Sequence, residues 1–530
     1  MVFLLICSFG IASEDLSIAE KIWKLSQNDE ISQSQKKTPS NGQKVIRLTI
    51  QDAVKYVIEN NITVKNAKYE IIKADSDLIK NDSKFLWKVL GTVESFRSTL
   101  PNNRLNVFTG TKISNDKFSA GIEKQFATGT YFKLEASAVR FDSNAFESSS
   151  TPADFKFMAV PPMYTGAVSF TLSQELLKSS FGKTEKNQVK ILENQTAMKR
   201  EELIYQLSGL IVQVLVDYWS LTIYDSAVQT YEKLLKNTIE IRDLTRRKQN
   251  LGLAEKFEIN QWNSALAGVK SQLEKTKQDR EETKIKLLRI LNVDPTSEVT
   301  GLTDLTENAV ALKKTISEDI DYAYQNRIDL RNVIREKEIS ELSLTNAEKE
   351  DIPSLKVSAT YSSRGQNLIS PQENYLNTEH AILSMKYPEY RGDVKLSYPL
   401  WDKGIKSNIR DALATREQVK LKEKKLRDEI LDEVKTRREA IEASFEILHK
   451  SQNMENELER FYKGVMGQFR QGKYPAIAVK NALDAYVQSQ LGTIQSKVNY
   501  NINILRYDLS KNYIFEKYGV DIVKIISEIR

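Results

Sequence analysis

The chain has 530 residues, of which 28% are charged and 40% hydrophobic, and its 77 lysines and arginines nearly balance its 71 acidic residues. This balance does not indicate a nucleic-acid-binding protein. The only cysteine is Cys7, and the two histidines, His380 and His449, are far apart in the sequence. This inventory excludes a disulfide and a histidine cluster at metal-ligand spacing. We find no phosphate loop or dinucleotide fingerprint, so we expect neither enzymatic chemistry nor a cofactor.

The N-terminus predicts an exported protein. Residues 1–13 form a mostly apolar stretch with small residues at the cleavage positions, as in a signal peptide. Lipid attachment at Cys7 is a lesser alternative, because Ile6 stands where a small residue belongs. Residues 14–47 are polar and are predicted to form a tail or linker. No later stretch reaches the roughly 18 apolar residues of a spanning helix, so any contact with a bilayer would be made by strands.

The first folded region changes from helical to strand periodicity. A helix is predicted from Thr49, where Asp52 completes a capping box, to about Phe85. Alternating segments between Leu90 and Leu172 then predict strands, among them a hairpin at about 115–141.

A very long helix is predicted from Lys183 to Asn250. No proline occurs from Met163 to Asp294, and apolar residues recur at steps of 3, 4 or 7. At 1.5 Å per residue this helix would be about 100 Å long. Further apolar residues lie off the seam, so we expect the helix to be covered on two faces, as in a wall of helices: Ile204, Ile211, Leu215, Tyr218, Trp219 and Ile223.

A returning helix completes the first long hairpin, 183–291. The chain turns at Leu251, Gly252 and Leu253, and a helix follows from about 254 to 291. A mixed segment over 292–317, expected at mid-height, precedes a third helix from about Asp319 to Glu350.

The second half repeats this order. Strands are predicted within 355–400, at Leu355 to Ser363 and Val394 to Leu400. A second long hairpin covers 406–513, with a turn at Gln471, Gly472 and Lys473. Residues 516–530 are predicted to be a tail.

Matching positions define two structural repeats, 48–317 and 318–515. Leu396 lies 224 positions after Leu172, Gly472 lies 220 after Gly252, and Asn326 lies 266 after Asn60. The first repeat therefore carries about 42 additional residues between its first helix and its long helix. They coincide with the 115–141 hairpin, whose placement the sequence leaves open.

The strand count indicates self-assembly. Without the additional hairpin, one chain supplies four principal strands, whereas about eight are needed to close a membrane barrel. Lipid does not tolerate open sheet edges. We therefore expect several copies to complete one barrel, and three copies would also supply twelve helical columns around a tube.

The strand-to-helix junctions resemble those of the TolC-type outer-membrane efflux family. The run LSYPLWDKG (396–404) is similar to that family's junction, and LSQELLKSSFG (172–182) is a weaker copy. The starts LTIQDAVKYVIENN (48–61) and DIDYAYQNRIDL (319–330) resemble its two repeat openings. The resemblance covers about 48–521.

This resemblance implies a mainly α fold with a β-barrel part, built as a homotrimer. Long helical hairpins would form a periplasmic α-helical tunnel, topped by a shared 12-stranded barrel in the outer membrane of a diderm bacterium. The implied function is a passive exit duct for efflux or type I secretion. The implied partners are outer-membrane lipid, a periplasmic adaptor (membrane fusion) protein and an inner-membrane pump.

The resemblance also assigns roles to the two hairpin tips. The residues expected to contact the adaptor are Leu251, Gly252, Leu253, Gln471, Gly472 and Lys473. Some family members carry an acidic ring six and nine positions after the second tip glycine, where this chain has Ala478 and Asn481. We therefore expect a gate that uses Glu258 with Arg246 or Arg247. The candidate aperture residues are Arg246, Arg247, Glu258, Asn481 and Asp484.

An elongated periplasmic coiled-coil scaffold, or an adaptor-like protein without a barrel, is the alternative. It explains the long helices but not the alternating segment that precedes each of them. The sequence specifies neither the transported substrate nor the class of pump.

Overall fold

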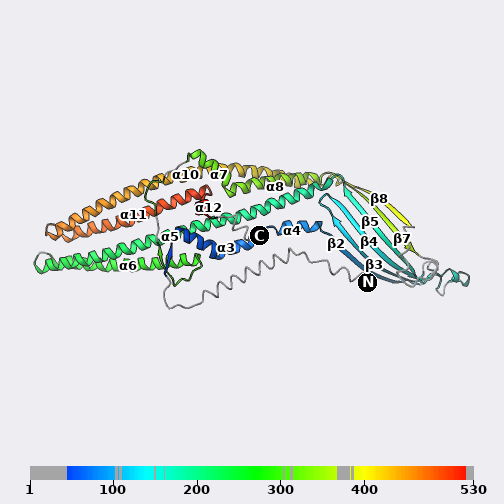
Figure 1. Cartoon of the computed structure of the whole chain (residues 1–530), viewed down its shortest axis with the longest axis horizontal. Coiled ribbons are helices and arrows are strands. Elements are labelled where there is room, and N and C mark those ends of the chain that lie inside the picture. The colour runs from blue at the N-terminus through cyan, green and yellow to red at the C-terminus, as the bar shows by residue number, and fades with distance from the viewer. Residues whose placement is uncertain are drawn as a thin grey trace.

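The computed structural model describes residues 45–101, 106, 110–147, 151–159, 161–252, 254–301, 305–310, 314–366, 382 and 387–520. The molecule is elongated, with the tips of its helical hairpins at one end and a β-sheet at the other (Figure 1). The predicted signal peptide, most of the predicted N-terminal tail and residues 521–530 lie outside the described residues.

The duplicated long hairpins are confirmed, and their lengths agree between the repeats. Helices α5 (Lys183–Asn250) and α10 (Lys403–Arg470) have 68 residues each. The returning helices α6 (Lys256–Ile290) and α11 (Ala476–Ser510) have 35 residues each. Helix α5 begins and ends at the residues predicted from its apolar seam. Helix α10 begins three residues before the predicted Lys406.

The prediction of one helix from Thr49 to Phe85 is wrong, because the chain breaks after α2 (Ile50–Asn60). The capping box is present, since the Asp52 amide donates to the Thr49 side chain at 3.1 Å. At Asn61 the backbone is extended, and its side-chain oxygen accepts from the Thr63 and Val64 amides. Three short helices therefore follow α2: α3 (Ile62–Lys73), α4 (Ser76–Asp82) and η2 (Ser83–Phe85).

The predicted helix from Asp319 to Glu350 breaks at the matching position of the second repeat. It consists of α7 (Ile316–Asn326) and α8 (Ile328–Glu350), with Arg327 extended between them. Arg327 forms ion pairs of 2.6 Å with Asp329 and with Glu433. Burial lowers the pKa of Arg327, but these hydrogen bonds outweigh burial and raise it above its ordinary value. The break is therefore held by partners on another helix.

The sheet holds six antiparallel strands in the order β2-β3-β4-β5-β7-β8. Its strands are β2 (Lys88–Thr99), β3 (Lys112–Gln125), β4 (Thr130–Ser143), β5 (Met163–Glu175), β7 (Ser354–Gln366) and β8 (Pro388–Ser397). The additional hairpin is β3 and β4, and it lies inside the sheet between β2 and β5. The four principal strands and the additional hairpin expected from the sequence are therefore all present, and together they form one sheet of six strands.

A second sheet, of two strands, lies in the mid-height region. Strand β1 (Val45–Leu48) pairs in parallel with β6 (Glu298–Gly301). The predicted tail, 14–47, therefore ends before Val45. Short helical turns complete the described elements: η4 (Ala153–Met158), η5 (Ser180–Gly182) and α12 (Ile514–Lys517).

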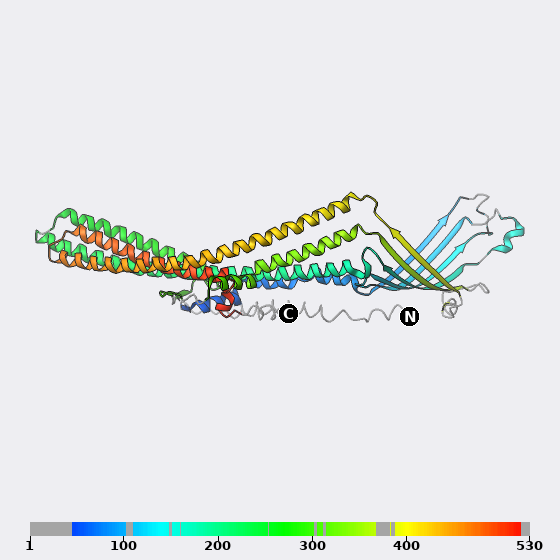
Figure 2. The ribbon, with the colours of Figure 1, turned by 90° about the horizontal axis from the view of Figure 1, so that it is seen from above.

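Helix α5 is covered on several sides, as its off-seam apolar residues predicted. Leu215, Tyr218 and Trp219 are buried in the main core with residues from α2, α6 and α11. The Tyr218 hydroxyl donates to the Leu48 carbonyl at 2.6 Å. Toward the sheet, α8 runs beside α5 and α10 runs beside α8 (Figure 2).

The helix from Ser180 to Asn250 contains a more apolar stretch than the sequence analysis identified. An 18-residue window in it has a mean hydropathy of 1.3, and by length and composition alone it is a candidate membrane span. Half of that window is buried inside the chain, and the core helix of a water-exposed protein passes the same test. This window is therefore weak evidence for a spanning helix.

A buried carboxylate ties α7 to the second long hairpin. The Asp319 side chain is 4% exposed and forms ion pairs of 3.1 Å with Arg438 of α10 and with Lys511. It also accepts a hydrogen bond from the Tyr507 hydroxyl.

Replacing this carboxylate should destabilise the fold. Asp319→Ala leaves Arg438 and Lys511 without their shared partner, and we expect the free energy of unfolding to fall by about 3 kcal/mol. Thermal unfolding followed by far-ultraviolet circular dichroism measures the change. The control is Glu417→Ala on α10, which removes exposed ion pairs with Arg416 and Lys420 and should leave the midpoint nearly unchanged. Equal midpoints for the two variants would contradict a structural role for Asp319.

Candidate functional site

One face of the six-stranded sheet is apolar and exposed. A single row of register-paired residues crosses all six strands: Val89, Ile122, Leu134, Phe170, Tyr361 and Tyr390. The edge residues Val93 and Val394 are 72% and 71% exposed. Large apolar side chains rarely gather in this way on a surface that meets water, so this face is suited to an apolar medium.

The opposite face of the sheet is polar. The neighbouring row of paired residues is Lys88, Glu123, Lys133, Thr171, Thr360 and Arg391. Because successive side chains of a strand point to opposite faces, each strand presents apolar residues to one side and polar residues to the other. This alternation is the pattern of strands that separate lipid from water.

The apolar face is bordered by ion pairs at one end and by aromatic rings at the other. Toward the strand ends distant from the helices, Asp116 pairs with Arg97 at 2.7 Å and lies 3.6 Å from Arg140. Where the strands meet the helices, Trp87 packs edge-on against Phe132, with ring centroids 5.6 Å apart. Phe181 and Trp401, which precede α5 and α10, are 65% and 83% exposed. Aromatic residues at such a border are typical of a membrane interface.

The two hairpin tips lie at the far end of the molecule from the sheet (Figure 1). Gly252 and Gly472 have φ angles of 74° and 79°, which favour glycine, as the predicted tight turns require. A Cβ atom at either position would meet nothing within 4 Å. The glycines are therefore needed for the backbone conformation and not for packing within the chain, and the surface at both turns is open.

Contacts between the tips hold the two hairpins together. The Lys248 amine of α5 donates to the Phe469 carbonyl of α10 and lies 3.9 Å from the centre of the Phe469 ring. Burial lowers the pKa of Lys248. Arg470 pairs with Glu240 at 2.7 Å, and both side chains are exposed. Beneath these contacts an apolar cluster with residues from all four long helices surrounds the buried Trp262.

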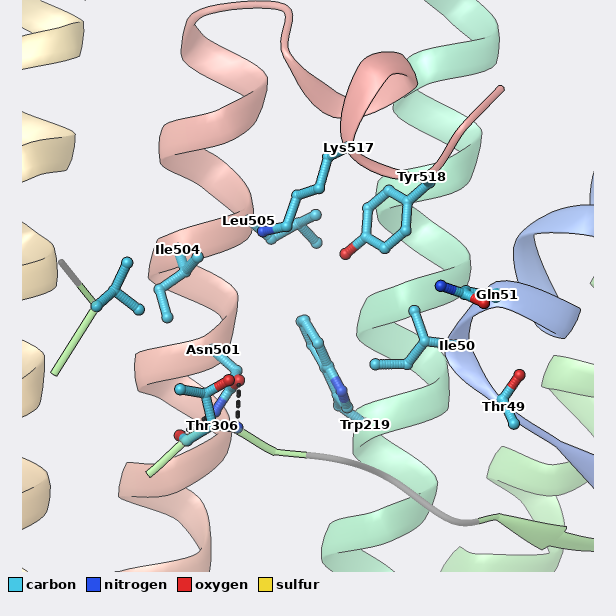
Figure 3. Close-up of a pocket in the computed structure, with 11 residues that line it drawn as sticks. Thr49, Ile50, Gln51, Trp219, Thr306, Asn501, Ile504, Leu505, Lys517 and Tyr518 are labelled. Carbon is cyan, nitrogen blue, oxygen red and sulfur yellow. Dashed lines mark hydrogen bonds between the residues drawn. The ribbon is translucent and has the colours of Figure 1, made fainter. Parts of the chain in front are cut away.

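A cavity of about 470 Å³ lies at mid-height, between α2, α5 and α11 (Figure 3). Trp219 and Leu505 line it, and the Asn501 side chain accepts a hydrogen bond from the Thr306 amide at 3.0 Å. Of its described lining residues only Lys517 carries a charge, and this amine is paired with Asp508. The lining therefore offers no set of groups for acid–base or nucleophilic chemistry. Within the described part of the chain, no group of three or more His, Cys, Asp or Glu side chains is placed to hold a metal ion.

Comparison with known proteins finds no matching family model and no matching curated protein. Among solved structures, the outer-membrane channel OprN is 12% identical with a TM-score of 0.64, covering 87% of this chain and 89% of that chain. The CmeC outer membrane channel of Campylobacter jejuni is 13% identical with a TM-score of 0.63, covering 91% of this chain and 89% of that one. The MtrE outer membrane channel of Neisseria gonorrhoeae, in its open state, is 11% identical with a TM-score of 0.59 over 88% and 89%.

The chain has the fold of these outer-membrane channels. The fold implied by the resemblance of the junction sequences, helical hairpins joined to a β domain, is thereby confirmed. At these identities the likeness concerns the fold alone, so function rests on the side chains of the sheet and the tips.

The predicted tip residues of this chain lie together at the end of the molecule that the helical hairpins form. Leu251 is 74% exposed, and Gln471, Gly472 and Lys473 are exposed beside it. Leu253 lies outside the described residues. Their contact with an adaptor stays a prediction.

The predicted gate pairs do not form within one chain. Among the described residues, Glu258 makes no ion pair with Arg246 or Arg247, which are both exposed. Glu258 is instead close enough to Lys248 to oppose the lowering of the pKa of that amine. Asp484 pairs with Lys480 at 2.7 Å on the surface of α11, and Asn481 is exposed. An aperture built from these five residues therefore remains a prediction that concerns assembled copies.

Two features of the site were missed by the sequence analysis. The strand β2 (Lys88–Thr99) alternates, but Gly91 interrupts its apolar side, so its extent was not predicted. The contact between Lys248 and Phe469 has no local signal, because the two residues are 221 positions apart.

Removing the Lys248 amine should loosen the tips. Lys248→Met keeps an apolar stem but removes the donor to the Phe469 carbonyl, so we expect faster amide hydrogen exchange around the α10–α11 turn, by roughly fivefold for a bond of about 1 kcal/mol. Mass spectrometry of exchange measures this. The control is Lys236→Met, an exposed lysine on the same helix. Unchanged exchange in Lys248→Met would show that the apolar cluster alone holds the tips together.

Proposed function

We propose that this chain is the outer-membrane exit duct of a tripartite efflux or type I secretion system. The duct is a passive channel, formed by a homotrimer and coupled to a periplasmic adaptor and an inner-membrane pump. The observation that carries this proposal is the exposed apolar row that crosses all six strands, from Val89 to Tyr390, on a sheet continuous with helices of 68 residues.

The two faces of the sheet support a wall between lipid and a water-filled lumen. An apolar face bordered by aromatic rings on one side and ion pairs on the other matches the outer surface of a membrane barrel. The polar face with Lys88, Glu123 and Lys133 then lines the lumen. In a water-soluble scaffold the same apolar row would promote aggregation, which argues against the scaffold alternative.

The edge strands of the sheet also support assembly of several copies of the chain. Within the described residues, β2 and β8 each pair on one side only. An unpaired strand edge in lipid costs several kcal/mol for each unsatisfied backbone group. Closure between copies removes both edges, and the stoichiometry of three follows the resemblance of the junction sequences to the TolC-type family.

The tips support coupling to other proteins. They lie at the end opposite the sheet (Figure 1), where a duct fixed in the outer membrane would meet an adaptor. The exposed turns around Gly252 and Gly472 allow close approach of a partner backbone, because they carry no side chain at their centres. We propose no substrate, because in such an assembly the pump selects it.

A charge on the apolar face should block membrane assembly. Leu134→Lys places an amine on the apolar face of β4, where a lysine in lipid costs about 2–4 kcal/mol. We expect a marked loss of the heat-modifiable oligomer from the outer-membrane fraction. The matched control is Ser137→Lys, which adds the same charge to the same strand but on the polar face. It should assemble as the native chain does.

Fractionation of native cells decides between the exit duct and the elongated scaffold. Recovery of the native chain in the cytosolic or inner-membrane fraction would contradict the duct, and so would equal assembly of Leu134→Lys and Ser137→Lys. A stable, dispersed monomer in buffer without detergent would favour the elongated scaffold.

Bulky residues at the tips should prevent coupling without preventing assembly. Gly252→Trp and Gly472→Trp place a large side chain where a partner would approach, so we expect the trimer to form but at least tenfold less inner-membrane partner to be recovered after crosslinking in cells. The control is Gly268→Trp, an exposed position on α6 where an added Cβ also meets open space. Normal recovery in both tip variants would mean that the glycines only terminate helices.

A further inference from the structure

The hairpin of β3 and β4 is an integral part of the sheet. Strand β3 is in register with β2 over twelve residues, from Lys112 to Glu123. Strand β4 is in register with β5 over Thr130 to Phe141. Both faces of the sheet continue across the hairpin, because Ile122 and Leu134 belong to the apolar row while Glu123 and Lys133 belong to the polar one. The hairpin therefore cannot lie beside the wall without breaking two strand pairings.

The turn of this hairpin is fixed to the start of α5. A Cβ atom on Gly182 would lie 1.7 Å from the Ala127 carbonyl oxygen, so only glycine fits there. The Gln174 side chain of β5 donates to the Thr128 carbonyl at 3.1 Å and accepts from the Thr130 hydroxyl at 2.5 Å. The junction is therefore shaped around the hairpin.

The second repeat has a similar junction without a hairpin, in which the N-cap residue of the long helix has a φ angle of −68° instead of 72°. Trp401 there has a φ angle of 55°, as Phe181 has 54° in the first repeat. The next residue, Asp402, occupies the position of Gly182, and its side chain caps α10 by accepting from the Gly404 amide at 2.8 Å. The first repeat lacks this side-chain cap. The difference between the two junctions is therefore explained by the hairpin turn.

Six strands match the width of the helical layer of one chain. Beside the sheet, the helical layer consists of α4, α5, α8 and α10, each joined to a strand of the sheet. At roughly 10 Å per helix these four columns span about 40 Å. Strands about 4.8 Å apart and tilted by about 40° occupy roughly 6 Å each along a circumference. Six strands then span about 38 Å, whereas four would span only about 25 Å.

From this we infer that three copies close into a barrel of 18 strands, in which β8 of each copy pairs with β2 of the next. This inference rests on the proposed homotrimeric duct and goes beyond it. Among the described strands, β2 and β8 each lack a partner on one side, and they run in opposite directions with respect to the helices. The new pairing is therefore antiparallel like all others in the sheet. The partner of each edge strand is therefore the opposite edge strand of another copy of this chain.

The consequence is a wide barrel that continues the helical tube without narrowing. Eighteen strands give a backbone radius of about 18 Å, against about 12 Å for twelve strands. Barrels of this size leave an aqueous channel. The membrane part of the duct would then not be its constriction.

Electron cryomicroscopy of the detergent-extracted oligomer tests the strand number. We expect the barrel of the full chain to be about 1.5 times as wide as that of a variant lacking residues 112–143. This deletion removes β3 and β4 together and leaves β2 antiparallel to β5. If the deletion variant does not fold, the absolute width of the full-chain barrel decides between about 36 Å and about 24 Å across the backbone wall.

Cysteine pairs test the junction between copies. Val93→Cys combined with Val394→Cys, and Val89→Cys combined with Leu396→Cys, place thiols on the apolar face of the two edge strands, so oxidation should give linked dimers and trimers. Val93→Cys combined with Phe170→Cys is the control, because β5 is an inner strand and should give monomers. Single-cysteine variants account for Cys7.

The outcomes separate this inference from the proposed duct. Linked trimers with a barrel about 36 Å wide support it. Linked trimers with a barrel about 24 Å wide overturn the 18-stranded closure but leave the duct standing. Absence of linked species together with absence of the chain from the outer membrane overturns both.

Discussion

The lateral covering of α5 is the constraint on which the rest of the structure depends. A helix of 68 residues cannot be stable in water by propensity alone, and its stability must come from burial of its apolar positions. Those positions run from Ile191 near the sheet to Ile241 near the tip. Short helices and α8 cover the half toward the sheet, while α6 and α11 cover the half toward the tip. One unbroken helix therefore joins the sheet to the hairpin tips.

The accuracy of the sequence analysis depended on how local the deciding interaction was. The bounds of α5 followed from its own apolar seam and lack of proline, and the tip glycines followed from the positive φ that a tight turn requires. The breaks at Asn61 and Arg327 were not predicted. Asn61 donates to the Ile290 carbonyl and Arg327 pairs with Glu433, and these partners are distant in sequence. The cap that Asn61 gives α3 is a local signal that the sequence analysis missed, whereas predicting the break at Arg327 would require the tertiary fold.

The candidate site was predictable in the same uneven way. The prediction that strands would make any contact with a bilayer came from the strand periodicity, and the prediction of the tips came from the turn motifs. The strand number did not follow, because one sequence cannot show whether an additional hairpin lies in a sheet or beside it. The answer lies in the register, where Ile122 and Leu134 align with Val89 on one side and Phe170 on the other.

In the proposed duct, the charges of the polar face would line the lumen. The charged residues of the row that begins at Lys88 are Lys88, Glu123, Lys133 and Arg391. Charges that face water are largely screened beyond about a Debye length, roughly 8 Å at physiological ionic strength. A lumen far wider than that length would therefore present little field to a solute at its centre. Discrimination by charge would require a narrower place, and the tips, where Glu258 lies close enough to Lys248 to affect its pKa, are the predicted one.

The two strand-to-helix junctions show how a repeat can accept an insertion. A glycine in place of an Asp N-cap costs a helix only a few tenths of a kcal/mol, on the order of 0.3, and α5 lacks the side-chain cap that Asp402 supplies to α10. Because Gly182 has no side chain, the turn at Ala127 fits beside it and makes its contacts with Gln174. The two strands that this turn joins add a register of thirteen paired residues to the sheet. Those pairings outweigh one missing cap, and with the hairpin present only glycine fits at this junction, because a Cβ atom at Gly182 would lie 1.7 Å from the Ala127 carbonyl oxygen. The residue at the start of the long helix and the number of strands in the wall are therefore coupled.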